Sequence, residues 1–187
     1  MTRLTDADIE LAPKVELHLH LEGSMRIETV RTLARESGVD LPPSLLGHGA
    51  AWSFAHFEDF LVQYAVACST LTTPDHFHRI ALELVEDLAR QRIRYAEVTF
   101  TPTGHARRLG SWTWPLHAVL SGFDEGRRRY GVAVGVILDH SREQPVELAI
   151  EAAKVAVAHA PCGVVALGLG GDEVYPPELF APAFDLA

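Results

Sequence analysis

The sequence predicts an α/β fold in which parallel strands alternate with helices. Four short apolar runs have the length and composition of strands, at residues 15–21, 93–101, 132–138 and 164–169. Three of these runs are almost entirely apolar, which is typical of parallel strands covered by helices on both faces. Two architectures have this organisation, an open doubly wound sheet and a (β/α)₈ barrel of the TIM-barrel type.

Helical patterns fill the segments between the predicted strands. Ser24 can cap a helix that ends at Gly38, and Thr73-Pro74 is a typical helix start. Apolar residues recur at helical spacing on one face of residues 57–68. Further helices are expected at residues 73–88, 116–129 and 146–159, and one that begins at Pro177.

The glycine pattern favours the barrel. A doubly wound dinucleotide-binding sheet needs a G-x-G-x-x-G loop after a strand, and Gly168 and Gly170 come closest to it. Glu173 occupies the position of the third glycine. A barrel takes about 250 residues, and the final segment PPELFAPAFDLA lacks a helix-closing signal. We therefore expect residues 1–187 to be the amino-terminal half of a single barrel domain, with about four βα units.

Charge and composition exclude several classes of partner. The chain has 16 basic and 25 acidic residues, a formal net charge of −9, which argues against nucleic acid and anionic membranes as partners. The first residues contain no signal-peptide core, and no apolar run reaches membrane-spanning length. Cys68 and Cys162 lie in apolar surroundings, which suggests buried, reduced thiols. These features predict a cytoplasmic protein that binds a small molecule.

The first strand carries a candidate metal site. Alternate residues of a strand share a face, so His18 and His20 would lie side by side, with Glu16 and Glu22 beyond them. Two neutral imidazoles can converge on one Zn²⁺ ion. The alternative is an ordinary half-exposed strand with a polar face. A second His-x-His pattern, His76 and His78, lies in the first turn of a helix, where we expect it to be solvated.

Three segments resemble the adenosine/adenine deaminase family of the metal-dependent amidohydrolases. They are PKVELHLHLEGS at residues 13–24, RYAEVTFTP at 94–102 and VVALGLGGDE at 164–173. Their order and spacing also fit, so the resemblance covers essentially the whole chain. It implies a barrel enzyme that uses zinc to deaminate adenosine or a related 6-aminopurine compound hydrolytically, with release of ammonia.

The resemblance also assigns site residues. His18 and His20 correspond to the first two zinc ligands, and His20, Glu22 and Gly171 to substrate-binding positions. The apolar face of residues 57–64 resembles the helix that covers the pocket in the family. The third zinc-binding His, the zinc-ligating Asp and the catalytic Glu of the family lie beyond the fourth strand. None of these catalytic groups can therefore be assigned before Ala187.

Two departures leave the substrate open. Glu22 stands where adenosine-specific members typically have Asp, and Gly168 stands where they often have Asp. Relatives that act on adenine or aminodeoxyfutalosine show such changes, so these compounds remain alternatives to adenosine. An alternative of another class is a non-catalytic half barrel or assembly module. We also expect the isolated chain to self-associate, because a half barrel has unpaired edge strands.

Two polar positions lie at the end of the third predicted strand. Asp139 and His140 follow its last apolar residues, where barrel active sites form. We expect them to be a solvated strand end, with a role next to the metal ligands as the alternative.

Overall fold

The computed structural model describes residues 5–46 and 52–187. Within them, one four-stranded parallel sheet has the order β1-β2-β3-β4. The strands are β1 (Lys14–His20), β2 (Ile93–Phe100), β3 (Ala133–Ser141) and β4 (Val164–Gly170). The strands lie side by side in the order of the sequence, as in a barrel. In a doubly wound sheet the order of the strands reverses part-way across the sheet. The predicted barrel-type α/β fold with about four βα units is confirmed.

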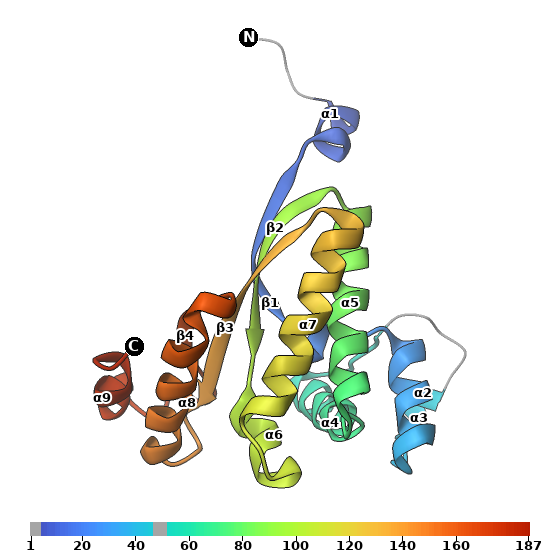
Figure 1. The fold of residues 1–187 in the computed structure, drawn as a ribbon. Coiled ribbons are helices and arrows are strands. Elements are labelled where there is room, and N and C mark those ends of the chain that lie inside the picture. The colour runs from blue at the N-terminus through green and yellow to red at the C-terminus, as the bar shows by residue number, and fades with distance from the viewer. Residues whose placement is uncertain (1–4, 47–51) are drawn as a thin grey trace.

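Helices join and cover the strands (Figure 1). The α-helices are α1 (Asp6–Leu11), α2 (Ile27–Ser37), α3 (Pro43–Leu46), α4 (Phe57–Ser69), α5 (Pro74–Arg90), α6 (Pro102–Leu109), α7 (Thr113–Tyr130), α8 (Val146–His159) and α9 (Ala181–Phe184). Short 3₁₀ turns are η1 (Glu22–Ser24), η2 (Ala160–Cys162) and η3 (Pro177–Phe180). Helices α2, α3 and α4 gather near the carboxyl end of β1, away from α1.

Helices α5 and α7 run side by side and pack closely (Figure 1). A Cβ atom added to Gly126 of α7 would lie 2.6 Å from Cβ of Val85 on α5. Glycine therefore allows the two backbones to approach. The main apolar core lies between these helices and the sheet, and includes the fully buried Phe77, Phe100 and Leu138.

The predicted alternation of β1 is wrong in its first half. The pairing with β2 shifts by one residue between Glu16 and Leu19, because Glu16 pairs with Ala96 whereas Leu19 pairs with Val98. Such a bulge moves the residues before it to the opposite face. Glu16 and Leu19 therefore line the same hollow against α5, and Glu16 does not share the face of His20. Val15, which pairs with Tyr95, is 60% exposed.

Several local predictions can be compared with the structure. Thr73 caps α5 as expected, since its hydroxyl accepts a hydrogen bond from the His76 amide at 3.3 Å. Ser24 does not cap α2, because its hydroxyl donates to the His20 carbonyl at 2.7 Å. Helix α6 was not predicted. The helix expected from Pro177 is a 3₁₀ turn followed by the short α9.

The sequence also predicts that both cysteines are buried and that no segment spans a membrane. Cys162 is exposed, contrary to the prediction, because it lies in the turn η2 between α8 and β4, whereas Cys68 is partly buried. Among the described helices, none combines the length and the apolar character needed to cross a bilayer.

Candidate functional site

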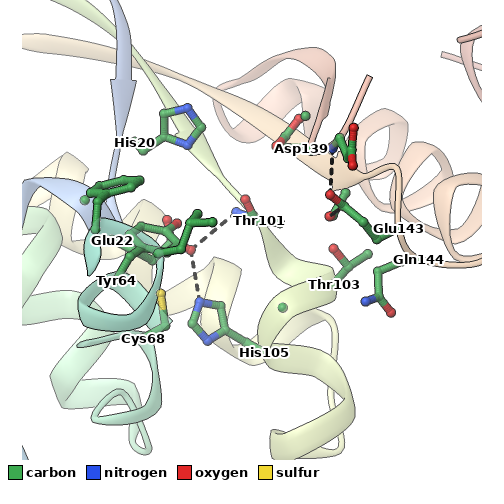
Figure 2. Close-up of a pocket in the computed structure, with 18 of the residues that line it drawn as sticks. His20, Glu22, Tyr64, Cys68, Thr101, Thr103, His105, Asp139, Glu143 and Gln144 are labelled. Carbon is green, nitrogen blue, oxygen red and sulfur yellow. Dashed lines mark hydrogen bonds and ion pairs between the residues drawn. The ribbon is translucent and has the colours of Figure 1, made fainter. Parts of the chain in front are cut away.

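A pocket of about 950 Å³ lies at the carboxyl ends of the four strands. This is the end of the sheet at which barrel enzymes place their chemistry. Figure 2 shows polar side chains from separate segments around the space. The lining residues are His20, Glu22, Gly23, Phe57, Phe60, Leu61, Tyr64, Cys68, Thr101, Thr103, Gly104, His105, Asp139, Ser141, Glu143, Gln144, Gly170, Gly171 and Asp172.

One side of the pocket, which we call the Glu22 wall, consists of Glu22, Tyr64, Cys68 and His105. Glu22 is 1% exposed and His105 2% exposed. Nε2 of His105 lies 2.9 Å from Oε1 of Glu22, and the Thr101 amide donates to the same oxygen at 3.4 Å. Oε2 of Glu22 is buried and has no hydrogen-bond partner within the described residues. One carboxylate oxygen is thus held by the protein, and the other is left for a donor in the pocket.

Glu22 and Arg108 together determine which nitrogen of His105 carries the proton. The Glu22 carboxylate can only accept, so Nε2 carries the proton, and the guanidinium of Arg108, which can only donate, lies 3.3 Å from Nδ1. Nδ1 is therefore the acceptor, and Nε2–H donates to Glu22. The same Nη2 group donates to the carbonyls of Cys68 at 3.2 Å and Leu71 at 2.8 Å, which ties α6 to the end of α4.

The opposite side, the Asp139 wall, consists of Asp139, Glu143, Gly170 and Gly171. Figure 2 shows Asp139 and Glu143 across the space from Glu22 and Tyr64. Asp139 is 7% exposed. Burial, and then the nearby charge of Glu22, raises the pKa of Asp139 to about 6, while the backbone amides of His140 and Gly170 act in the opposite direction. The charge of Glu22 on one wall thus disfavours ionisation of Asp139 on the facing wall.

Glu143 organises the loop beyond β4. Its carboxylate accepts hydrogen bonds from the Ser141 hydroxyl and, at 2.6 Å, from the Asp172 amide. The Ser141 bond is the main cause of the lowered pKa of Glu143. Gly171 has φ of +92°, and a Cβ there would collide with the Glu143 carboxylate. The positive φ therefore favours glycine at this position, and a side chain there would displace the Glu143 carboxylate.

Helix α4 covers the pocket with aromatic side chains. Phe57 stacks on Phe60 with ring centroids 5.9 Å apart, and Phe60 contacts the tilted ring of Tyr64 at 5.8 Å. Phe57 is 67% exposed and Leu61 46% exposed. Burial is the largest cause of the raised pKa of the Tyr64 hydroxyl, and the charge of Glu22 adds to it. This apolar cover can exclude water from a bound ligand.

The structure brings most of the predicted site residues together. His20, Glu22 and Gly171 line the pocket, whereas His18 does not. The rings of His18 and His20 are nevertheless neighbours, with centroids 5.5 Å apart. Two adjacent imidazoles suit Zn²⁺ as part of a ligand set. No group of three or more His, Cys, Asp or Glu residues in the described ranges is placed to hold a metal.

The polar residues expected to be solvated differ from prediction. His76 is 9% exposed, because Nδ1 contacts the Thr70 carbonyl at 3.1 Å and the Thr72 amide at 3.2 Å. Asp139 and His140 are also buried, so the expectation of a solvated strand end is wrong. The ring of His140 packs against Phe180 at 5.5 Å, because the segment after β4 covers it.

Sequence reasoning missed His105 and Glu143. His105 follows the RYAEVTFTP segment by three residues and lies in α6, whose sequence has no strong apolar pattern that predicts a helix. Glu143 follows β3 in a loop, where only its proximity to Asp139 pointed to the site. Both residues lie just beyond the carboxyl end of a strand, where barrel active sites form, and this position is the sequence feature that could have pointed to them.

Comparison with known proteins places the chain in a family. The adenosine deaminase family model matches residues 13–187. The chain belongs to the adenosine deaminase family. It is 34% identical over 196 aligned residues to the adenosine deaminase of Mycobacterium ulcerans, covering 99% of this chain and 54% of the relative. It is 31% identical over 185 residues to that of Clostridium kluyveri, covering 96% and 53%. The chain thus spans about half the length of these relatives.

Solved structures agree in fold. A zinc-bound amidohydrolase from Burkholderia ambifaria aligns with a TM-score of 0.84 at 30% identity, over 100% of this chain and 52% of that one. The adenine deaminase of Arthrobacter aurescens gives 0.81 at 25% identity, over 92% and 53%. The N6-methyl-AMP deaminase of Arabidopsis thaliana gives 0.79 at 27% identity, over 95% and 55%.

Proposed function

We propose that this chain forms the amino-terminal half of a zinc-dependent barrel enzyme that hydrolytically deaminates adenosine or a related 6-aminopurine compound. The observation that carries the proposal is the meeting of His20, Glu22 and Gly171 in one pocket. These residues come from or just beyond β1 and β4, the two edges of the sheet. Membership in the adenosine deaminase family supports the reaction type.

His18 and His20 would supply two ligands to the zinc ion. When bound there, zinc would supply an activated water molecule for attack on the ring carbon that bears the amine. The bound zinc of the Burkholderia relative supports this choice of metal. The remaining ligands and the acid that protonates the purine ring would come from outside this chain.

The residues of the chain itself would bind and orient the purine compound. The free Oε2 of Glu22 would accept a hydrogen bond from a substrate hydroxyl or amine, since a buried acceptor needs a donor. The backbone at Gly171 would approach the purine ring. The aromatic face of α4 would exclude water. The relatives named above act on adenosine, adenine and N6-methyl-AMP, so the substrate could be a base, a nucleoside or a nucleotide.

The proposal is tested by zinc content and ammonia release in the full-length protein. We expect the His18→Ala/His20→Ala double variant to lose its zinc and at least 10³-fold in kcat/KM, because removal of metal ligands removes the activated water. His117 and His159 form a matched control pair on α7 and α8, with Nε2 atoms 2.9 Å apart. The His117→Ala/His159→Ala variant should keep both zinc and activity.

Substrate choice is measured with adenosine, deoxyadenosine, adenine and aminodeoxyfutalosine.

Unchanged zinc in the His18→Ala/His20→Ala variant would contradict the metal site. Absence of ammonia release from every compound, with zinc bound, would contradict the reaction and favour a non-catalytic role. The chain of residues 1–187 alone should release no ammonia, because it lacks the catalytic acid of the proposed mechanism.

A further inference from the structure

The segment after β4, residues 173–187, is held to the fold by two buried side chains, and we call it the strap. Phe180 of η3 and Ala183 of α9 are buried and pack with Ala149 and Ala153 of α8. The other side chains of the strap are exposed. These four residues form a cluster of their own beside the main core, and α9 lies next to α8, away from α5 and α7 (Figure 1). The strap therefore depends on a small apolar contact.

His140 lies under the strap at the end of β3. It is 1% exposed, and its ring packs against Phe180 with centroids 5.5 Å apart. On β4 its neighbour across the sheet is Leu169. Neither ring nitrogen of His140 has a hydrogen-bond partner of normal geometry within the described residues. Because burial without a partner opposes a charge, the closed strap favours the neutral imidazole.

The charged groups near His140 do not compensate for its burial. The charge of Glu143 and the backbone of Gln144, both in the loop after β3, raise the pKa of His140, but burial outweighs them and lowers that pKa below its ordinary value. Arg142 in the same loop donates to the Tyr175 carbonyl of the strap at 3.1 Å. The carboxylates on the strap and at the start of α8 are exposed, namely those of Glu147, Glu173, Glu178 and Asp185. A proton on His140 thus places a charge inside an apolar contact.

We propose that His140 makes the strap sensitive to acid, so that protonation of its ring releases residues 173–187 from β3 and α8. Once the strap is open, the imidazole is solvated and has the pKa of an ordinary histidine, 6.5. The contribution of the neutral ring to the closed form is therefore present above pH 6.5 and is lost as the pH falls below it. Between pH 7.5 and pH 5.0 this linkage raises the opening equilibrium by up to roughly 30-fold.

Release of the strap also affects the pocket, whatever compound the pocket binds. Gly171 and Asp172 line the pocket and directly precede the strap. The Asp172 amide is fixed by Glu143 at 2.6 Å, so the strap is anchored at one end by this bond and at the other by Phe180 and Ala183. Loss of the second anchor would loosen the wall that Gly171 and Asp172 form.

Hydrogen–deuterium exchange of the full-length protein at pH 7.5, 6.0 and 5.0 tests the proposal. After correction for the intrinsic effect of pH on amide exchange, peptides of residues 178–187 should exchange at least about five-fold faster at pH 5.0 than at pH 7.5. Peptides of β2, which lies inside the sheet, should change less than about two-fold.

Two variants remove the titrating group and keep a side chain of similar size. His140→Phe keeps an aromatic ring against Phe180, and His140→Gln keeps a neutral polar group. In both variants, exchange in the strap should change less than about two-fold between pH 7.5 and pH 5.0. His78→Gln is the matched control, because His78 pairs with Glu125 between α5 and α7 at 3.1 Å. It should keep the wild-type response of the strap.

The neighbouring Asp139 titrates in the same range with the opposite sign. Its pKa is raised to about 6, so its protonation favours the folded protein as the pH falls, and Asp139→Asn should keep the faster exchange of the strap in acid. Exchange in the wild-type strap that does not change with pH would overturn the inference. So would an equal response in His140→Phe, His140→Gln and the wild type, or an equal change in β2.

Discussion

The two walls of the pocket each bury a carboxylate, and they stabilise it differently. On the Glu22 wall, His105 and the Thr101 amide donate to one oxygen of Glu22. On the Asp139 wall, the carboxylate lies between two glycines without a basic partner, and its pKa is raised to about 6 by burial and by the charge of Glu22. The first wall holds one oxygen of its carboxylate with a histidine and a backbone amide, whereas on the second wall the backbone amides of His140 and Gly170 offset only part of the cost of burial.

Removal of His105 should have the largest effect on this contrast. His105→Ala leaves the fully buried Glu22 without its main donor, and removal of one partner from a buried pair costs about 3 kcal/mol or more. Urea unfolding at pH 7 measures the loss. The double variant Glu22→Gln/His105→Ala should lose less than the sum of the single losses, because the two side chains interact directly. A loss below about 1 kcal/mol in His105→Ala would show that the Glu22 wall does not depend on this bond.

The charge of Asp139 should appear in the pH dependence of stability. Its pKa in the folded protein is raised from 3.8 to about 6, so the folded state binds this proton more tightly than the unfolded chain. The contribution of Asp139 to the free energy of unfolding is therefore most favourable below pH 4 and is lost as the pH rises through 6. The Asp139→Asn variant has no carboxyl group at this position and does not lose stability in this way.

We compare the free energy of unfolding of Asp139→Asn with that of the wild type. The difference, variant minus wild type, should increase by about 2 kcal/mol between pH 4 and pH 7. Urea unfolding in the presence of a chelator at several pH values measures this difference and removes any contribution of bound metal. A difference that stays constant with pH would mean that Asp139 is ionised normally.

The space between Gly168 and Gly170 that holds the Asp139 carboxylate, which we call the glycine notch, gives a smaller, steric test. Gly168→Ala places a Cβ 2.7 Å from Oδ1 of Asp139, and such overpacking costs about 1–2 kcal/mol. Asp139→Ala/Gly168→Ala should recover part of that loss, because the carboxylate is gone. Gly104→Ala on α6 is the control, since its Cβ would meet nothing within 4 Å. It should be neutral or stabilising by up to about 1 kcal/mol. Equal losses in both single variants would show that the notch is not specific.

Strand positions could be predicted from the sequence because apolar runs and parallel pairing are local properties. The predicted strands at residues 93–101 and 164–169 differ from β2 and β4 by one residue. The bulge in β1 could not be predicted, because it depends on pairing with Tyr95 and Ala96, about 80 positions along the chain. The faces of Val15 and Glu16 were therefore assigned incorrectly.

The grouping of residues in one pocket was predictable where they follow a recognisable motif. His20, Glu22 and Gly171 were named from the sequence, and they line one pocket. His105 and the buried state of Asp139 were not foreseen, since both depend on contacts between distant segments. His105 meets Glu22 across 83 residues, and Asp139 is enclosed by glycines of the neighbouring strand. Burial of this kind arises from tertiary packing.

Arg108 joins the carboxyl end of α4 to His105 through a single guanidinium nitrogen, Nη2. Its guanidinium holds the carbonyls of Cys68 and Leu71 at the carboxyl end of α4 and also donates to Nδ1 of His105. A displacement of this end of α4 would therefore also pull Arg108 away from Nδ1 of His105, while the Glu22 carboxylate, which can only accept, would keep the proton on Nε2. The covering helix leaves Arg108 in place only if it swings from its other end, where Phe57 is exposed.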